Sequence, residues 1–203
     1  MAPSSRALAA SERAALADLF DELGPDAPTC CAGWTTAHLA AHLAVRDGRP
    51  DALPGYGVEE VGAGGPLASW SHRLEDRLRE STPFAEVVRR VRSGPRPWSP
   101  LSWPAVPQIL NVTEYAVHHE DVRRAQPGWE PRALPRTVQD QLWTAATLSG
   151  RRRAGRRGLV LRRTDLTGVE KRFGAVGRTV AGEPMELLLW VAGRRDVARV
   201  VIT

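Results

Sequence analysis

The sequence predicts a mainly helical protein that ends in a small α+β region. Apolar residues recur at helical spacing through residues 1–150, whereas the remainder contains short runs typical of strands. The character changes at an arginine-rich stretch, residues 151–157, which is typical of a solvated linker. We therefore expect a helical domain over residues 1–150 and a small α+β domain over residues 151–203.

Caps, prolines and glycines mark where the expected helices begin and end. Helices are predicted over residues 5–23, 36–46, 67–80, 83–94, 108–125 and 135–149. The Gly- and Pro-rich residues 47–66 predict a loop. Residues 95–107 hold five prolines and two tryptophans. They predict an ordered loop in which Trp98 and Trp103 bury against a surface.

The C-terminal part is expected to form a sheet with one helix. GLVLRRTDL (residues 158–166) and VEKRF (169–173) predict two strands joined by a turn at Thr167 and Gly168. GRTVAG (177–182) predicts a third strand, EPMELLLWVA (183–192) a helix, and ARVVIT (198–203) a closing strand.

Composition excludes several classes of protein. No apolar stretch approaches the roughly 20 residues that span a bilayer, and the N-terminus lacks the pattern of a signal peptide, so a cytoplasmic location is expected. The adjacent Cys30 and Cys31 cannot form an unstrained disulfide. No G-x-S-x-G, P-loop or G-x-G-x-x-G motif is present, which removes support for serine-hydrolase, nucleotide and dinucleotide chemistry.

The net charge of +5 comes almost wholly from arginine, because Lys171 is the single lysine. One interpretation is GC-rich codon usage. The other is a preference for anions, since guanidinium groups bind carboxylates and phosphates through paired hydrogen bonds. No aromatic residues interleave with the arginine run at 151–157, so nucleic acid is not an expected partner.

Histidines and carboxylates share faces on two of the predicted helices. His38 and His42 are four residues apart on one helix, and Glu114 and His118 are four apart on another. One helix can supply such a pair and a neighbouring helix a third ligand, which leaves an open position on zinc. Asp121 follows His118 by one turn and can fix its tautomer, whereas His119 points away. The alternative is that Glu114 pairs with an arginine.

Other candidate residues receive structural interpretations. His72 lies in the charged segment SWSHRLED and is interpreted as a surface residue. Cys31 precedes the second helix by a few residues and can lie near the site, although a buried inert thiol is the simpler interpretation.

Three segments resemble a known family. Residues 31–52 (CAGWTTAHLAAHLAVRDGRPDA) resemble the C-x-G-W-T-x-x-x-L-x-x-H-L segment of the DinB-like superfamily, in its mycothiol-dependent maleylpyruvate isomerase branch. Residues 111–125 (NVTEYAVHHEDVRRA) resemble that branch's Glu-x-x-x-His segment, and residues 182–194 (GEPMELLLWVAGR) the helix of its C-terminal domain. The resemblance is strongest to an uncharacterised, actinobacterial-type group of metal-binding proteins.

The resemblance implies a DinB-type four-helix bundle followed by a C-terminal α+β domain. It places one divalent metal ion, with zinc expected, on His42, Glu114 and His118. The family usually has Asp or Asn where this chain has His38, so His38 is expected beside the site. Characterised relatives use the metal to activate the thiolate of mycothiol or a similar low-molecular-weight thiol for transfer or isomerisation.

Competing hypotheses follow. In the first, the protein is a mycothiol-dependent transferase or isomerase acting on a small, acidic electrophile, and Arg194 is a candidate carboxylate clamp. In the second, it is a non-catalytic metal-binding or sensing module, and in the third an arginine-rich anion or nucleic-acid binder. The expected oligomeric state is a monomer or homodimer, with no membrane partner.

Overall fold

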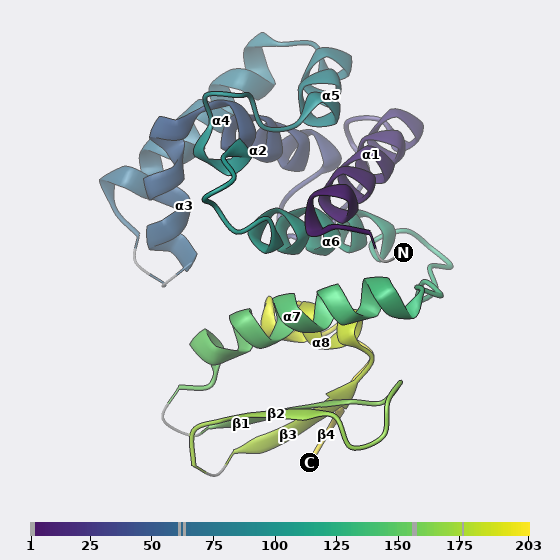
Figure 1. The fold of residues 1–203 in the computed structure, drawn as a ribbon. Helices are drawn as coiled ribbons and strands as arrows, with labels where there is room; N and C mark the ends of the chain where they lie inside the picture. The colour runs from purple at the N-terminus through teal and green to yellow at the C-terminus, as the bar shows by residue number, and fades with distance from the viewer. Residues whose placement is uncertain (1–2, 61, 63, 156–157, 176) are drawn as a thin grey trace. The chain divides into compact units, whose positions relative to one another are not determined.

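The computed structural model describes residues 3–60, 62, 64–155, 158–175 and 177–203. Helices dominate the chain before residue 155, and strands are confined to its C-terminal part (Figure 1). The longer helices are α1 (Ser5–Leu23), α2 (Thr36–Gly48), α3 (Leu53–Glu60), α4 (Pro66–Ser81), α5 (Phe84–Ser93), α6 (Ile109–Arg123), α7 (Arg136–Arg153) and α8 (Pro184–Val191). Short 3-10 turns lie at Pro50–Ala52 and Pro100–Ser102.

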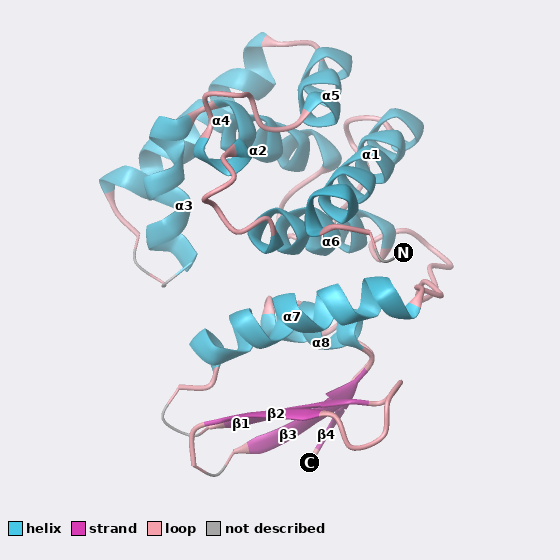
Figure 2. Cartoon of the chain, viewed as in Figure 1, coloured by secondary structure: helices cyan, strands magenta, loops and turns pink. Residues whose placement is uncertain are grey.

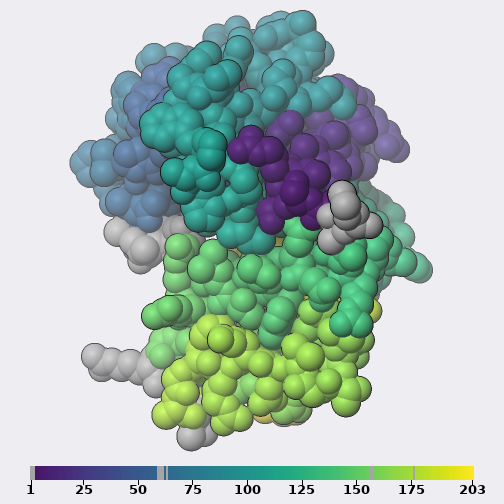
Figure 3. Space-filling view, viewed as in Figure 1, coloured from purple at the N-terminus to yellow at the C-terminus, as the bar shows by residue number. Residues whose placement is uncertain are grey.

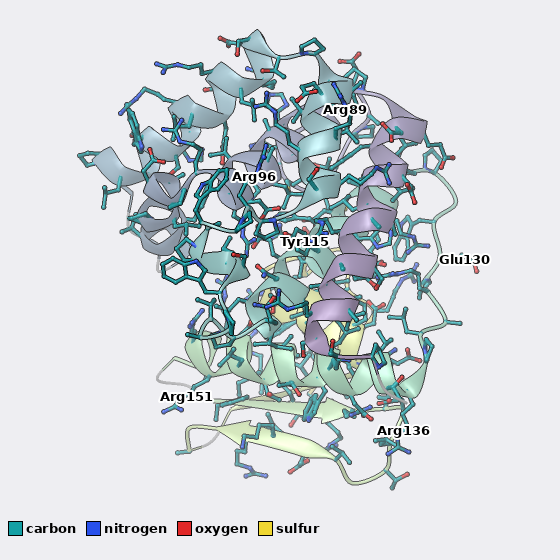
Figure 4. All side chains as sticks on the ribbon, turned by 45° about the horizontal axis from the view of Figure 1, so that its top comes forward. Arg89, Arg96, Tyr115, Glu130, Arg136 and Arg151 are labelled. Atoms are coloured by element: carbon teal, nitrogen blue, oxygen red, sulfur yellow. The ribbon has the colours of Figure 1, made fainter. Side chains whose placement is uncertain are left out.

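Two expectations about local structure are wrong. The segment 47–66 was expected to be a loop, but it contains α3, which packs against α4. The arginine-rich stretch 151–157 was expected to be a linker, but Arg151, Arg152 and Arg153 form the last turn of α7. Arg156 and Arg157 of that stretch lie outside the described residues. Basic side chains are favourable there because the C-terminus of a helix carries partial negative charge. Figure 4 shows Arg136 and Arg151 near opposite ends of this helix.

The strands form one mixed sheet with the order β2-β1-β3-β4 (Figure 2). These strands are β1 (Leu159–Arg163), β2 (Glu170–Phe173), β3 (Arg178–Gly182) and β4 (Val201–Ile202). β1 pairs antiparallel with β2 and parallel with β3, and β3 pairs antiparallel with β4. The predicted strands and the helix between them are therefore confirmed, although the closing strand is shorter than expected.

Helices α7 and α8 cover the sheet. They pack against each other, α7 also contacts β1 and β2, and α8 contacts β3. In the space-filling view the green of α7 adjoins the yellow-green of the strands (Figure 3). The interior strand β1 is buried at four of its five positions, and every residue of α8 is buried.

Contacts divide the chain into two compact units, and each unit gathers separate stretches of sequence. Unit 1 comprises Met1–Ala9, Ile109–Val117 and Glu130–Thr203, and unit 2 comprises Ala10–Gln108 and His118–Trp129. Helix α6 contributes residues to both units. These contact-based units do not test whether the chain has two domains that meet at residue 150, so that boundary stays a prediction.

Unit 2 is built around α2, which packs against α4 and α5. Leu39 and Leu43 of α2 are fully buried, as is Phe20 of α1. The Phe20 ring meets the Phe84 ring edge-on at 6.3 Å between centroids, a favoured aromatic geometry. This packing fixes the position of α2, the helix that carries His38 and His42, against α4 and α5.

The prolyl loop between α5 and α6 differs from expectation in one respect. Trp98 and Trp103 were expected to be buried, but 58% and 48% of their surfaces are exposed. The loop is ordered instead by backbone hydrogen bonds through the Pro100–Ser102 turn and by the Ser102 hydroxyl, which donates to two carbonyl groups.

Among the described residues, none of the helices is both long enough and apolar enough to cross a membrane.

Candidate metal centre

Helix α2 places His42 against a carboxylate of α4. The Nδ1 atom of His42 lies 2.9 Å from Oε1 of Glu75, and both side chains are about nine-tenths buried. Tyr56 of α3 donates its hydroxyl hydrogen to the same oxygen at 2.7 Å. The other oxygen, Oε2, lies 3.2 Å from Nδ1 of His72. Three side chains therefore share one buried carboxylate.

The Glu75 carboxylate is favoured in its charged form. Burial alone would raise its pKa, but hydrogen bonds from His42, Tyr56 and His72 outweigh burial and hold the pKa of Glu75 below its usual value. A charged Glu75 accepts a hydrogen bond from Nδ1 of His42. That arrangement leaves Nε2 of His42 as the nitrogen that can bind a metal ion.

Aromatic rings enclose the His42 imidazole. Its centroid lies 5.4 Å from that of Trp34, 4.9 Å from Tyr56 and 5.3 Å from His118. The rings restrict how far the imidazole can rotate. The contact with His118 brings α2 and α6 together at two candidate ligand residues.

A second carboxylate holds His118. Nδ1 of His118 lies 2.8 Å from Oδ2 of Asp121, one turn later on α6, and the Asp121 side chain is fully buried. The Cys31 thiol donates to the same oxygen at 3.2 Å, and its sulfur lies 3.9 Å from Nδ1 of His118. Cys31 therefore lies near the site, as one of its two interpretations expected, and its side chain is partly exposed rather than buried.

Two overlapping groups of side chains can hold a metal ion among the described residues. One is His42, Glu114 and His118, and the other is Cys31, His118 and Asp121; within each, the ligand atoms lie within 4.8 Å of one another. Both sets fit zinc, which accepts imidazole, carboxylate and thiolate ligands. The groups share His118. Because Asp121 occupies Nδ1 of that residue, Nε2 remains for the group that contains His42 and Glu114.

Two other histidines have structural partners. Nδ1 of His38 accepts a hydrogen bond from the backbone N–H of Thr35 at 3.2 Å and lies 3.0 Å from the Thr35 hydroxyl, which secures the start of α2. Nδ1 of His119 lies 2.7 Å from Oε2 of Glu12, and both side chains are buried. Neither residue belongs to either group of potential ligands.

Arg194 follows α8 in unit 1. Its Nη1 atom donates to the carbonyl oxygen of Ala192 at 2.9 Å. This hydrogen bond closes the C-terminal end of α8, a usual role for a basic side chain at that position.

Glu75 and Tyr56 were not identified from the sequence. A signal for Glu75 existed, because His72 and Glu75 are three residues apart and share a face of α4. Nothing local indicates that this face meets His42. The surface interpretation of His72 holds for its exposure, which is 44% of the side chain, but not for its contact with the site.

Comparisons with known proteins establish the fold. No family model matches the chain, and no curated protein matches it. A solved mycothiol-dependent maleylpyruvate isomerase and a histidine-to-alanine mutant of that enzyme superpose on it with TM-scores of 0.54 and 0.55. Each is 19% identical, and each alignment covers 98% of this chain and 90% of the other. The chain has the fold of that isomerase.

At this identity the likeness shows the fold alone. The fold is mainly helical with a small four-stranded sheet, which confirms the fold class expected from the sequence.

Proposed function

We propose that the protein binds one divalent metal ion, zinc in the first place, through His42, Glu114 and His118. The observation that carries the proposal is the meeting of two imidazoles, each with Nδ1 against a carboxylate. Such carboxylate–histidine pairs orient ligands and make them more basic. In this scheme Asp121 positions His118, and His38 stays a neighbour of the site.

We further propose that the bound metal serves a mycothiol-type thiol in a transferase or isomerase reaction. When bound, a divalent metal stabilises the thiolate form of a coordinated thiol. Two nitrogen ligands and one carboxylate leave a position open for it. The solved structures that share the fold are described as mycothiol-dependent, which supports a thiol partner.

The same proposal includes the family and the domain organisation of the chain. We place the protein in the uncharacterised metal-binding group of the DinB-like superfamily, with a four-helix bundle within residues 1–150 and an α+β domain at 151–203. We also propose a cytoplasmic location. Arg194 is proposed as the clamp for an acidic, electrophilic substrate. The proposed oligomeric state is a monomer or homodimer, and no nucleic-acid partner is proposed.

Metal analysis of the purified protein tests the ligands. We expect about one divalent ion per chain, and we expect His42→Ala, Glu114→Ala and His118→Ala each to lose most of it. Cys31→Ser should retain the ion, because Cys31 belongs to the competing group. Loss of metal from Cys31→Ser with retention in His42→Ala and Glu114→Ala would place the ion on Cys31, His118 and Asp121 instead.

Calorimetric titration with mycothiol tests the function. The metal-loaded protein should bind the thiol and gain thermal stability, because a ligand that binds only the folded state stabilises it. The metal-free protein and His42→Ala should show neither effect. If the metal-loaded protein gives no heat and no shift in Tm at millimolar thiol, the thiol proposal fails and the non-catalytic metal-binding module becomes the leading hypothesis.

A further inference from the structure

A second feature of unit 2 is a cavity of about 380 Å³ between α2, α4, α5 and the loop after α5. None of the candidate metal ligands lines it. Its charged and polar wall includes Arg49, Arg77, Arg90, Arg96 and Trp98. Guanidinium groups that share a cavity repel one another, and an anion bound between them would relieve that repulsion.

Helix α4 supplies one continuous face of the cavity. Leu74, Arg77, Leu78 and Ser81 line it, and their spacing places them on one side of the helix. Leu74 and Leu78 belong to an apolar cluster with Val45 of α2. The cavity therefore has an apolar floor beneath a cationic rim.

Negative charge at the cavity is much weaker than positive charge. Asp47 is the carboxylate among the lining residues, and it pairs with Arg46 at 3.1 Å. The ends of α2 and α4 add partial charges of about −0.5 each. Arg49 and Arg90 are themselves paired with carboxylates, so the excess of positive charge at the cavity comes from Arg77 and Arg96.

Two of the arginines are available to a ligand. Arg49 pairs with Asp51 through two hydrogen bonds, and Arg90 pairs with Glu86. Within the described part of the chain, by contrast, no carboxylate lies within ion-pair distance of Arg77 or Arg96. The Arg96 guanidinium instead lies 5.5 Å from the centre of the Trp98 ring. Trp98 is 58% exposed, so a planar group can stack on it.

We infer that this cavity binds a small organic dianion with a planar body, whose carboxylate or phosphoryl groups pair with Arg77 and Arg96. Guanidinium binds either group through paired N–H donors. The planar body would rest on Trp98 and on the leucines of α4. The inference does not depend on the metal site.

Titration calorimetry with two aromatic dianions tests the inference and separates the two anion chemistries. The probes are isophthalate and phenyl phosphate, and neutral isophthalamide is the control for shape. At least one dianion should bind, and isophthalamide should not. Preference for isophthalate would identify a carboxylate site, and preference for phenyl phosphate a phosphoryl site.

Matched variants locate the binding. Arg77→Gln and Arg96→Gln should each weaken binding at least about 10-fold, as loss of a charged hydrogen bond does. Arg89→Gln removes the same charge from α5, but Arg89 pairs with Glu86 and does not line the cavity, so affinity should stay unchanged. Figure 4 labels both Arg89 and Arg96. All three positions are exposed, so the variants should fold.

Two results would overturn the inference. One is the absence of heat from either dianion at 10 mM, a concentration of the order used to detect weak ligands with Kd near 1 mM. The other is binding that Arg77→Gln and Arg96→Gln leave intact but His42→Ala abolishes, which would move the anion to the metal centre. Full binding by His42→Ala would separate this site from the proposed function.

Discussion

Carboxylates set the chemistry of individual imidazoles in this protein. Glu75 faces Nδ1 of His42 at 2.9 Å, and Asp121 faces Nδ1 of His118 at 2.8 Å. In each case the second nitrogen is left for another partner. If His42 binds a metal ion as proposed, Glu75, on a different helix, is the residue expected to orient it.

Glu75→Gln should weaken metal affinity by about 10–100-fold, as changes beside a metal ligand do. The amide keeps the volume but loses the charge that fixes the His42 tautomer. Competition with a chelator measures the affinity, and circular dichroism verifies the fold. Glu86→Gln on α5 is the control, because Glu86 pairs with arginines of its own helix. Equal affinities for both variants would show that Glu75 does not position His42.

The close approach of α3 to α4 depends on one glycine. A Cβ atom at Gly55 would overlap the Ser71 hydroxyl and lie 2.5 Å from the carbonyl oxygen of Leu67. The Ser71 hydroxyl donates to Ala52 at 2.8 Å, so it is not free to move away. At Gly57, two residues later, an added Cβ meets nothing within 4 Å.

Gly55→Ala should lower the free energy of unfolding by about 1–3 kcal/mol, the usual cost of overpacking. Gly57→Ala on the same helix should raise it by up to about 1 kcal/mol, because alanine favours helix. Urea denaturation measures both. If the two variants are equally stable, α3 does not pack against α4 as closely as described.

An arginine of β1 connects the sheet to α7. Nη1 of Arg163 donates to Asp140 at 2.6 Å, and its Nε and Nη2 donate to Asp165 at 2.9 and 2.6 Å. The hydrogen bond from Arg163 lowers the pKa of Asp165 and outweighs burial, which opposes it. Asp165 therefore stabilises the fold when charged.

Asp165→Asn should cost about 1 kcal/mol near pH 7, a modest value because solvent screens the pair. The pKa of Asp165 is lower in the folded protein than in the unfolded chain. The contribution is thus complete above the unfolded value of about 3.9 and disappears as pH falls through the folded pKa. Unfolding experiments between pH 2 and pH 7 should show the two proteins converging in acid. Asp76→Asn, at an exposed pair with Arg79, should match the wild type throughout.

The sequence predicted most helices and strands because their apolar residues recur with a regular period. It failed at α3, where Pro54, Gly55 and Gly57 are typical of a loop. Packing against α4 outweighs that local preference. The candidate site shows the same limit, because contacts between helices cannot be read from the spacing within one helix. Spacing within one helix indicated Glu114, His118 and Asp121, whereas the contact of His42 with Glu75 depends on how two helices meet.

At the scale of the whole molecule, α6 links the unfolding of the two units, because it contributes residues to both. Its continuous backbone runs from unit 1 into unit 2, and α1 also has residues in both. Opening either unit therefore disturbs helices that belong to the other. We expect the two units to unfold in one cooperative transition.

Hydrogen exchange at rising denaturant concentrations tests this expectation. The slowest amides of α2, in unit 2, and of α7, in unit 1, should exchange with the same free energy of opening and the same denaturant dependence. Exchange of α7 through a smaller opening, with α2 still protected, would show that the units unfold separately.

Because the two units alternate along the sequence, the ribosome completes unit 2 before it completes unit 1. Unit 2 has all of its residues once Trp129 has been added to the growing chain, whereas unit 1 still lacks Glu130–Thr203. At bacterial or eukaryotic elongation rates those residues take roughly 4–15 s to appear. During that interval the Ile109–Val117 half of α6 has none of the α7, α8 or strand residues of its own unit beside it. The nascent chain thus passes through a stage in which Met1–Ala9 is the one other segment of unit 1 that is available to that half of α6.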